Sequence, residues 1–446
     1  MRFTGWMAGL AFGLVLTAGV AAAEEGKTPI ARNVILFIAD GWSQSSIDAA
    51  NYFHHGRAKA QLYERWFELP MATYAAGGSY DPEAAWADFD YVKGGATDSA
   101  AAGTALATGT LTTSGRLGLD PDGNRLTLVT EAAHAAGKAA GSISDVMFFH
   151  ATPAAFGAHV ESRGMYPEIS QQMIEESKLS VIMGAGHPYY DDDSQLREEP
   201  DYERVGGTEL WHRLASGEAG NDLNGDGEID PWLLIETEEE FQALASGEGE
   251  IPSRLIGVAR VGGTLQHNRG GDDKADAYEV PFNEGVPTLA EMTQASLHVL
   301  NQNDNGFFLM VEGGAIDWAG HGNRAGRIIE EMTFFNEAVA SAIAWVEEHS
   351  SWDETLIVVT GDHDCGYLMG PDSDPDFQPV LNKGKGNMPG MKFNSTGHTN
   401  QLIPLFLRGP GVERLANRNE GVDPVHGPFV QIATVGQFLI EAVAGE

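Results

Sequence analysis

The chain has 446 residues, of which 42% are hydrophobic, and it carries 27 Lys and Arg against 64 Asp and Glu, a formal net charge of −37. This balance excludes a nucleic-acid-binding function, because contact with a phosphate backbone needs clustered basic side chains. The hydrophobic content is enough for a large core, which excludes a disordered tail. Cys365 is the only cysteine, so the chain forms no internal disulfide.

The N-terminus has the pattern of a signal peptide over residues 1–23. Arg2 is the basic start, residues 6–20 are apolar, and three alanines end at Ala23. A retained membrane anchor is the alternative, since residues 3–23 carry no charge. The small residues favour cleavage near Ala23, which predicts a periplasmic or secreted protein, without membrane attachment, formed by residues 24–446.

Five apolar runs of strand length follow along the chain, and most of them lead into acidic residues. Continuous apolar runs are typical of strands that are buried on both faces of a parallel sheet. They are residues 34–39 before Asp40, 139–144 before Asp145, 307–311 before Glu312, 356–360 before Asp362 and His363, and 402–407 after His398.

Helical patterns lie between these runs. Apolar residues recur at helical spacing over residues 329–346, with glutamates among the positions between them. Alternating strands and helices predict an α/β three-layer sandwich, with a central mostly parallel sheet and helices on both faces. Ligands of such sheets bind beyond the carboxyl ends of the strands, where the acidic residues lie.

One short stretch, GGATDSAAAGTALATG over residues 94–109, places a single serine in front of an alanine-rich helix. Thr97, Asp98 and Ser99 all suit the start of a helix, where free N–H groups favour anions. The stretch is therefore either an ordinary capped helix or the position of a nucleophile, Ser99.

Two irregular stretches are predicted to be surface insertions of the same catalytic domain. Residues 186–280 are rich in Gly, Asp and Glu, and we expect an acidic insertion there. Residues 370–395 are rich in Pro, Gly and Asn, and we expect loops near the site.

Within the first insertion, NDLNGDGEID matches the early positions of a Ca²⁺-binding loop. The terminal glutamate of such a loop is missing, because Leu233 stands at that position. A solvated acidic loop is the alternative to calcium. The calcium ligands would be Asp222, Asn224, Asp226 and Asp230.

Asp and His residues that could bind a metal gather at the predicted sheet edge. Asp317 and His321 are four apart and would share one face of a helix. Each residue alone has an ordinary structural explanation, but so many acids could not lie close together without cations. Two zinc-like ions, a known device for displacement at phosphorus, would also activate the Ser99 hydroxyl. The set comprises Asp40, Glu312, Asp317, His321, Asp362, His363 and His398.

These residues lie in six motifs that resemble the successive motifs of the alkaline phosphatases. In chain order the motifs are NVILFIADGWS, GGATDSAAAGTALATG, HATPAAFGAHVESR, FLMVEGGAIDWAGH, VVTGDHD and STGHTNQLIPLFLRGPG, from residue 33 to residue 411.

The resemblance implies a role for each motif residue. Ser99 would become phosphoserine, Arg163 would bind two phosphate oxygens, and Asp98 would orient Arg163. One zinc would be held by Asp317, His321 and His398, a second zinc by Asp40, Asp362 and His363, and one magnesium by Asp40, Thr152 and Glu312.

Two positions depart from the enterobacterial pattern of that family, which has Asp and Lys there. His150 and Trp318 are instead similar to marine bacterial members. The change removes a carboxylate near the third metal and a cation near the phosphate. We therefore expect weaker phosphate retention. The family also implies small phosphomonoester substrates and a homodimer, and the acidic charge suits a halotolerant protein.

Rival functions remain at this point. A phosphodiesterase or sulfatase could use the same fold, although Arg163, Thr152 and Glu312 favour monoesters. A periplasmic metal- or phosphate-binding protein would bind the same ligands without turnover. An acid-rich surface protein would show no fixed zinc stoichiometry.

Overall fold

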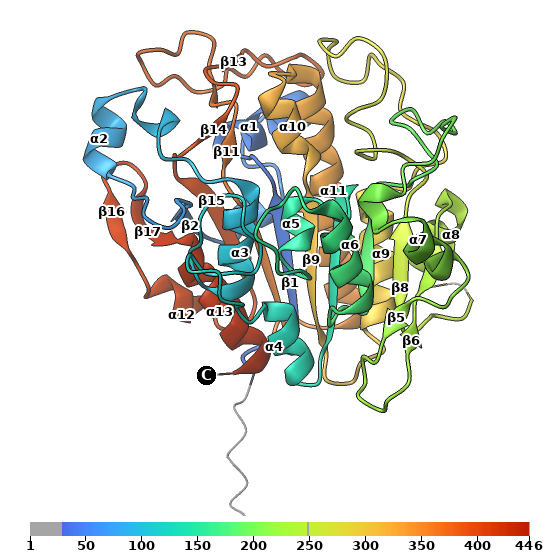
Figure 1. The fold of residues 1–446 in the computed structure, drawn as a ribbon. Coiled ribbons are helices and arrows are strands. Elements are labelled where there is room, and N and C mark those ends of the chain that lie inside the picture. The colour runs from blue at the N-terminus through green and yellow to red at the C-terminus, as the bar shows by residue number, and fades with distance from the viewer. Residues whose placement is uncertain (1–28, 248, 446) are drawn as a thin grey trace, which may run out of the picture.

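An 11-stranded sheet forms the centre of the computed structural model, which describes residues 29–247 and 249–445 (Figure 1). The seven strands from β10 to β7 are all parallel. In spatial order the strands are β16 (Gly421–Asp423), β17 (Gly427–Gln431), β2 (Phe67–Ala72), β15 (Ile403–Arg408), β10 (Thr355–Gly361), β1 (Asn33–Ala39), β9 (Phe307–Gly313), β3 (Ala139–Met147), β4 (Val181–Ala185), β8 (Leu255–Val258) and β7 (Leu233–Ile235).

Helices cover both faces of this sheet, which confirms the predicted three-layer α/β fold (Figure 1). One face carries α3 (Ser99–Thr108), α4 (Val129–Ala135), α5 (Ala151–Ala154), α6 (Tyr166–Glu175) and α13 (Ile432–Ala444). The other carries α1 (Gln44–His55), α9 (Leu289–Leu300) and α11 (Ala325–His349), which includes the predicted helix at 329–346.

The remaining elements are short. They are helices α2 (Pro82–Ala87), α7 (Thr208–Ala215), α8 (Glu238–Ala245), α10 (Ala315–His321) and α12 (Val412–Ala416), three 3-10 turns at 63–65, 91–93 and 203–205, and two-residue strands β5 (Gly220–Asn221), β6 (Asp230–Pro231), β11 (Asp364–Cys365), β12 (Leu368–Met369), β13 (Lys392–Phe393) and β14 (His398–Thr399).

The central strands owe their burial to the apolar runs that form them. Every residue of β1, β9 and β10 is buried, as expected for parallel strands covered on both faces. In the register of the sheet, Ala39 pairs with both Gly313 and Gly361. Asp40 and Asp362 are therefore the first residues beyond two neighbouring strands. Glu312 is the penultimate residue of β9, which pairs with β1 on its other side.

Strand β15 differs from the other predicted strands because it runs antiparallel to β10 and β2. An apolar run has the same composition in either direction, so the sequence does not reveal this orientation. The reversal has a functional consequence: the start of β15 lies at the edge where the parallel strands end. His398, which precedes β15, is thereby brought to the acidic residues.

The stretch 186–280, expected to be a surface insertion, is partly built into the sheet. Its strands β7 and β8 continue the parallel sheet beyond β4, and all four residues of β8 are buried. These strands have only three and four residues, which is too short for a clear apolar run. Residues 191–200, by contrast, are largely exposed.

The predicted calcium loop connects β5 and β6, far from the end of the sheet that carries α10 (Figure 1). Its carboxylates accept hydrogen bonds from the loop's own backbone: Asp222 from Gly225 and Gly227, and Asp230 from Leu223. Asn224 and Asp226 accept similar bonds. Calcium binding stays a prediction.

The signal-peptide prediction for residues 1–23 lies outside the described residues. Among the helices of residues 29–247 and 249–445, none combines the length and the apolar character needed to cross a bilayer.

Candidate active site

Ser99 is the first residue of α3 and lies at the carboxyl edge of the sheet. Asp98 caps this helix: its Oδ1 accepts hydrogen bonds from the N–H groups of Ala101 at 3.1 Å and Gly115 at 3.0 Å. The Ser99 side chain is buried, and its Oγ lies 3.3 Å from Nε2 of His363. Small residues, mostly alanines, allow α3 to pack closely against α13, where Gly436 faces Ala105.

A first group of ligand-type side chains surrounds His363. Its Nε2 lies 3.5 Å from Oδ1 of Asp40 and 3.2 Å from Oδ2 of Asp362. The hydroxyl of Thr152 lies 3.4 Å from the other Asp40 oxygen. Glu312 accepts a short hydrogen bond from Ser144. The structure thus brings both carboxylates of the predicted second zinc site to His363.

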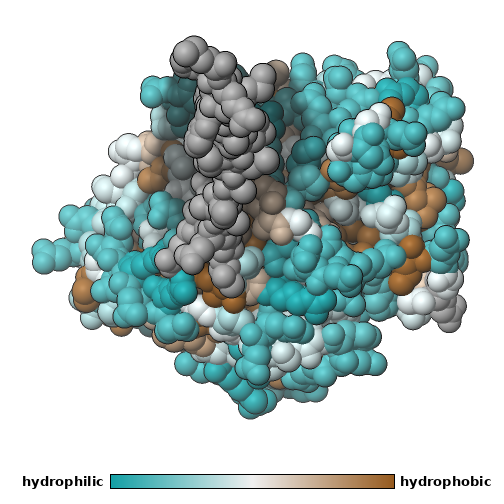
Figure 2. All heavy atoms as spheres, turned by 90° about the horizontal axis from the view of Figure 1, so that it is seen from below, coloured by the Kyte–Doolittle hydropathy of each residue, from teal (hydrophilic) through white to brown (hydrophobic). Residues whose placement is uncertain are grey.

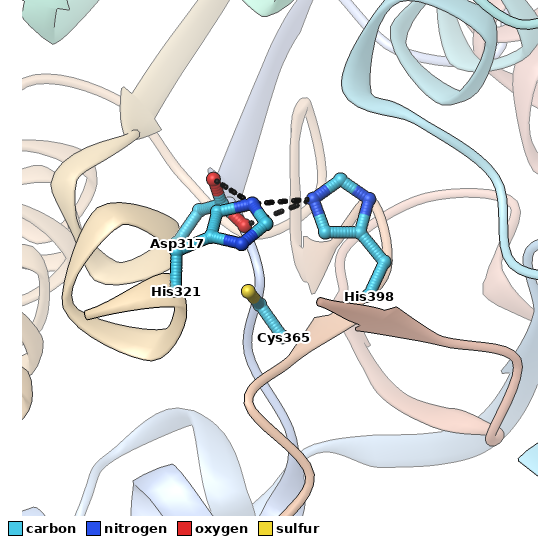
Figure 3. A group of neighbouring side chains, drawn as sticks. All are labelled: Asp317, His321, Cys365 and His398. Atoms are coloured by element: carbon cyan, nitrogen blue, oxygen red, sulfur yellow. Dashed lines mark hydrogen bonds and ion pairs between the residues drawn. The ribbon is translucent and has the colours of Figure 1, made fainter. Parts of the chain in front are cut away.

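A second group joins Asp317, His321 and His398, the residues of the predicted first zinc site (Figure 3). The Nε2 atoms of the two histidines are 3.0 Å apart and lie 3.5 and 3.3 Å from the Asp317 carboxylate. Cys365 adds a thiol to this group, and one donor atom of each of the four residues lies within 4.8 Å of all the others. Asp317 also groups with Asp40 and His363, so the two groups are contiguous.

The backbone sets the tautomers of both histidines in the second group. Nδ1 of His321 lies 2.7 Å from the carbonyl of Thr396, and Nδ1 of His398 lies 2.8 Å from that of Thr97. Each Nδ1 therefore carries a proton, since a carbonyl can only accept. The neutral form of each ring presents a lone pair on Nε2, directed at Asp317, which is the usual arrangement of metal-ligating histidines.

Burial opposes charge on the carboxylates of this site. It raises the pKa of Asp40 to about 7, with a further rise from Asp317, and it raises the pKa values of Glu312 and Asp362 well above their usual range. At Asp317 the opposing effect of burial is outweighed by a hydrogen bond from His398, which lowers the pKa of Asp317. Burial also opposes charge on His398, but Asp317 raises its pKa to about 9. Without a metal, His398 is therefore protonated, and its positive charge lies beside the Asp317 carboxylate, where a metal cation would bind.

These donors fit divalent metal ions. Oδ1 of Asp40, Oδ2 of Asp362 and Oε1 of Glu312 are buried and find no hydrogen-bond donor within the described part of the chain. Unpaired buried carboxylate oxygens are costly unless a cation compensates them. Asp and His are ordinary zinc ligands, and the all-oxygen set of Asp40, Thr152 and Glu312 suits magnesium.

Arg163 is positioned beside Ser99 by two contacts. One guanidinium nitrogen lies 3.1 Å from Oδ2 of Asp98, and the other lies 3.2 Å from Nε2 of His150. Burial and the nearby Arg163 lower the pKa of His150 to about 3, so this ring is neutral. Trp318 lies edge-on to it, with ring centroids 5.7 Å apart. The two residues that depart from the enterobacterial pattern are therefore neighbours.

Ser99, Arg163 and the second group of ligand-type residues open into one cavity of about 530 Å³ through Asp317, His321 and His398. Four of its lining residues, His267, Asn268, Gly322 and Arg324, were not predicted as site residues, and neither was Cys365 beside the metal ligands. His267 and Asn268 lie in the stretch expected to be an insertion, and their residue types carry no motif signal. The cavity is lined by Ser99, His150, Arg163, His267, Asn268, Asp317, Trp318, His321, Gly322, Arg324 and His398.

Comparison with known proteins agrees with this geometry. A family model described as "Alkaline phosphatase" matches residues 31–404. Alkaline phosphatase H of Pseudomonas aeruginosa is 31% identical over 404 residues, covering 88% of this chain and 74% of that protein. Alkaline phosphatase 4 of Bacillus subtilis is 29% identical over 396 residues, covering 83% and 72%.

Solved structures show the same fold. The alkaline phosphatase from the Antarctic bacterium TAB5 superimposes with a TM-score of 0.63 at 23% identity, covering 94% of this chain and 99% of that one. The Thermus thermophilus alkaline phosphatase gives a TM-score of 0.65 at 21% identity, covering 97% and 96%.

Proposed function

The chain belongs to the alkaline phosphatase family and hydrolyses phosphate monoesters with the help of metal ions, and on this premise we propose that Ser99 is its nucleophile. The observation that carries the proposal is the position of Ser99 Oγ, 3.3 Å from His363 and beside a buried, uncompensated set of carboxylates. Among the described residues, Ser99 is the only serine or threonine that lines the cavity of about 530 Å³.

The steps follow from the positions of these groups. The Ser99 hydroxyl gives up its proton and its oxygen attacks phosphorus in line with the ester oxygen. The P–O ester bond breaks, and the alcohol leaves after taking up one proton, which balances the proton lost by Ser99. The guanidinium of Arg163, held by Asp98, donates hydrogen bonds to two phosphate oxygens and keeps the phosphoryl group in place. Water then attacks the phosphoserine and releases inorganic phosphate with Ser99 restored.

The metal assignment is part of the same proposal. Asp317, His321 and His398 would hold one zinc, and Asp40, Asp362 and His363 would hold a second. When bound, the ions supply positive charge that stabilises the Ser99 alkoxide, the attacking water and the departing oxygen.

Magnesium is proposed at Asp40, Thr152 and Glu312. Two solved structures of the TAB5 enzyme, in which a histidine is replaced by Asp or Glu, have Mg bound in the M3 site. In those variants a carboxylate replaces the histidine, so the support for magnesium in this chain, which has His150, is the oxygen set of Asp40, Thr152 and Glu312 itself.

The decisive test compares Ser99→Ala with Ser246→Ala, which changes an exposed serine at the end of α8 that does not line the cavity. We expect Ser99→Ala to lose about 10³-fold or more of kcat on p-nitrophenyl phosphate with its zinc and magnesium content unchanged. Ser246→Ala should match the wild type. A fully metallated Ser99→Ala that turns over at the wild-type rate would refute the assignment.

The rivals on the same fold are separated by substrate. Assays with p-nitrophenyl phosphate, the bis-ester and the sulfate ester should show the monoester to be preferred. Arg163 supports this preference, because its two guanidinium nitrogens suit two free phosphate oxygens and a diester has one fewer. A zinc- or phosphate-binding protein without turnover would hydrolyse none of the three.

Export and assembly are also proposals. We expect cleavage near Ala23, which N-terminal sequencing of the mature protein would locate. We further expect a homodimer, which light scattering coupled to size exclusion would detect.

A further inference from the structure

A second guanidinium, that of Arg324, lines the same cavity as Ser99. Arg324 precedes α11, and its side chain lies against the α-carbon of Gly322, where a Cβ would come within 2.7 Å of Nε. Gly322 thus leaves the space in which the Arg324 side chain is held. A larger residue there would force the Arg324 side chain to shift.

The remaining contacts of Arg324 are weak. One terminal nitrogen lies 3.2 Å from Oδ2 of Asp273, an ion pair whose side chains are 27% and 53% exposed. The other lies 3.4 Å from Nε2 of His267. The buried Nε has no partner among the residues that the structure describes. An exposed pair of this kind contributes little, so a ligand could compete with Asp273 for the guanidinium.

Arg324 differs from its neighbours in the cavity by its positive charge. The cavity is lined by only two arginines in the described chain, and Arg163 is already assigned to the phosphate that is transferred. His267 adds no charge, because burial lowers its pKa to about 4. Trp318 adds an apolar ring, 6.3 Å from that of His267. Arg324 is therefore a cation in the part of the cavity that remains for the alcohol.

We propose that Arg324 binds an anionic group on the alcohol part of the substrate, and that Asp273 competes with it. The enzyme would then prefer phosphate monoesters whose leaving group carries a carboxylate or a second phosphate. This inference rests on the proposed function and adds a substrate class to it. A bidentate contact is open to such a group, since guanidinium presents five donors in a planar fork.

The test compares two aryl phosphates that differ in one charge, 4-(carboxymethyl)phenyl phosphate and its methyl ester. The measured quantity is the ratio of kcat/KM for the acid to that for the ester. Arg324→Gln should lower this ratio about tenfold, the effect of one charge-assisted hydrogen bond. Asp273→Asn, which removes the competitor, should raise it. Arg125→Gln changes an exposed arginine outside the cavity and should leave it unchanged.

A second pair, propane-1,3-diyl bisphosphate and 3-hydroxypropyl phosphate, shows whether a phosphate is preferred to a carboxylate. The effect of Arg324→Gln should shrink as NaCl is added, because salt screens an exposed guanidinium.

A ratio that is the same in wild type, Arg324→Gln and Asp273→Asn for both pairs would overturn the inference while leaving the phosphatase activity intact. If the wild type hydrolyses none of the esters, the proposed function itself fails.

Discussion

Four carboxyl groups meet at the end of the central strands with almost no contact with water. Asp40, Glu312 and Asp362 are 0% exposed, and Asp317 is 5% exposed. Mutual repulsion and burial would keep some of them protonated unless cations take the place of the protons. The need for metal is therefore a property of the folded site as well as of the reaction.

Removal of the metals should make stability depend on pH. In the folded protein burial raises the pKa of Asp40 from 3.8 to about 7, so the folded state holds a proton that the unfolded chain has lost. Stability is then highest below pH 4 for this group and falls as the pH rises through 7. Urea unfolding of the chelated protein should show a lower free energy of unfolding at pH 8 than at pH 5.

The control is Asp40→Asn, which cannot lose that proton. Its chelated form should lose less stability over the same pH range. With zinc and magnesium restored, the wild type should keep its stability at pH 8. An equal loss in the chelated wild type and in Asp40→Asn would show that general charge repulsion, not this carboxyl, causes the effect.

Trp318 allows a prediction about product binding. It lines the cavity beside the neutral His150, so the wall near Arg163 lacks a second cation. Trp318→Lys would add one, and we expect the inhibition constant for inorganic phosphate to fall about tenfold. Trp318→Phe keeps an aromatic ring and should leave it near the wild-type value. Steady-state inhibition assays decide this, and an unchanged constant in Trp318→Lys would contradict the role given to this position.

At the scale of elements, the position of Ser99 depends on how α13 packs against α3. A Cβ on Gly436 would lie 2.1 Å from the carbonyl oxygen of Ala105 and 2.7 Å from the amide of Gly109. Gly436→Ala should therefore push the helices apart and cost about 1–3 kcal/mol of stability. Because Ser99 begins α3, kcat/KM should fall as well. The control is Thr434→Ala, at a half-buried position on α13. In thermal unfolding and phosphatase assays it should stay close to the wild type. An unchanged melting temperature for Gly436→Ala would show that the contact is not tight.

The elements also show which parts of the fold could be predicted from sequence. The strands β1, β9 and β10 were predictable because continuous apolar runs end in acids, and those acids reach the site by the parallel register alone. The direction of β15 was not predictable, since an apolar run has no polarity. The short strands β7 and β8 were missed because three or four residues do not make a periodic pattern.

The site shows the same limit. Asp317 and His321 share a helix, so their spacing predicts their proximity. Cys365 and Arg324 lie only two and three residues after His363 and His321, but their residue types carry no motif signal. His267 reaches the site through contacts between distant segments. The pairing of β11 with β14, which sets Cys365 opposite His398, is one such contact.

For the whole molecule, the acidic charge is in conflict with an anionic substrate. The chain has a formal charge of −37, and the face seen in Figure 2 is mostly hydrophilic, with its hydrophobic residues in small groups. Such a field repels phosphate monoesters over long distances. The positive charge that attracts the substrate would come from bound metals, Arg163 and Arg324, and it acts over the short distances of the cavity.

Salt should therefore speed the capture of substrate. The Debye length falls from about 30 Å at 0.01 M salt to about 3 Å at 1 M, which removes the long-range repulsion but leaves contacts within the cavity less affected. We expect kcat/KM for p-nitrophenyl phosphate to rise from low to high NaCl, while kcat, measured at saturating substrate, changes less because capture no longer limits the rate. The same titration with sucrose in place of NaCl controls for changes in water activity and viscosity. A kcat/KM that is flat or falls with NaCl would mean that the field of the whole molecule does not reach the approaching substrate, and that the local positive charge of the cavity governs its capture at every ionic strength.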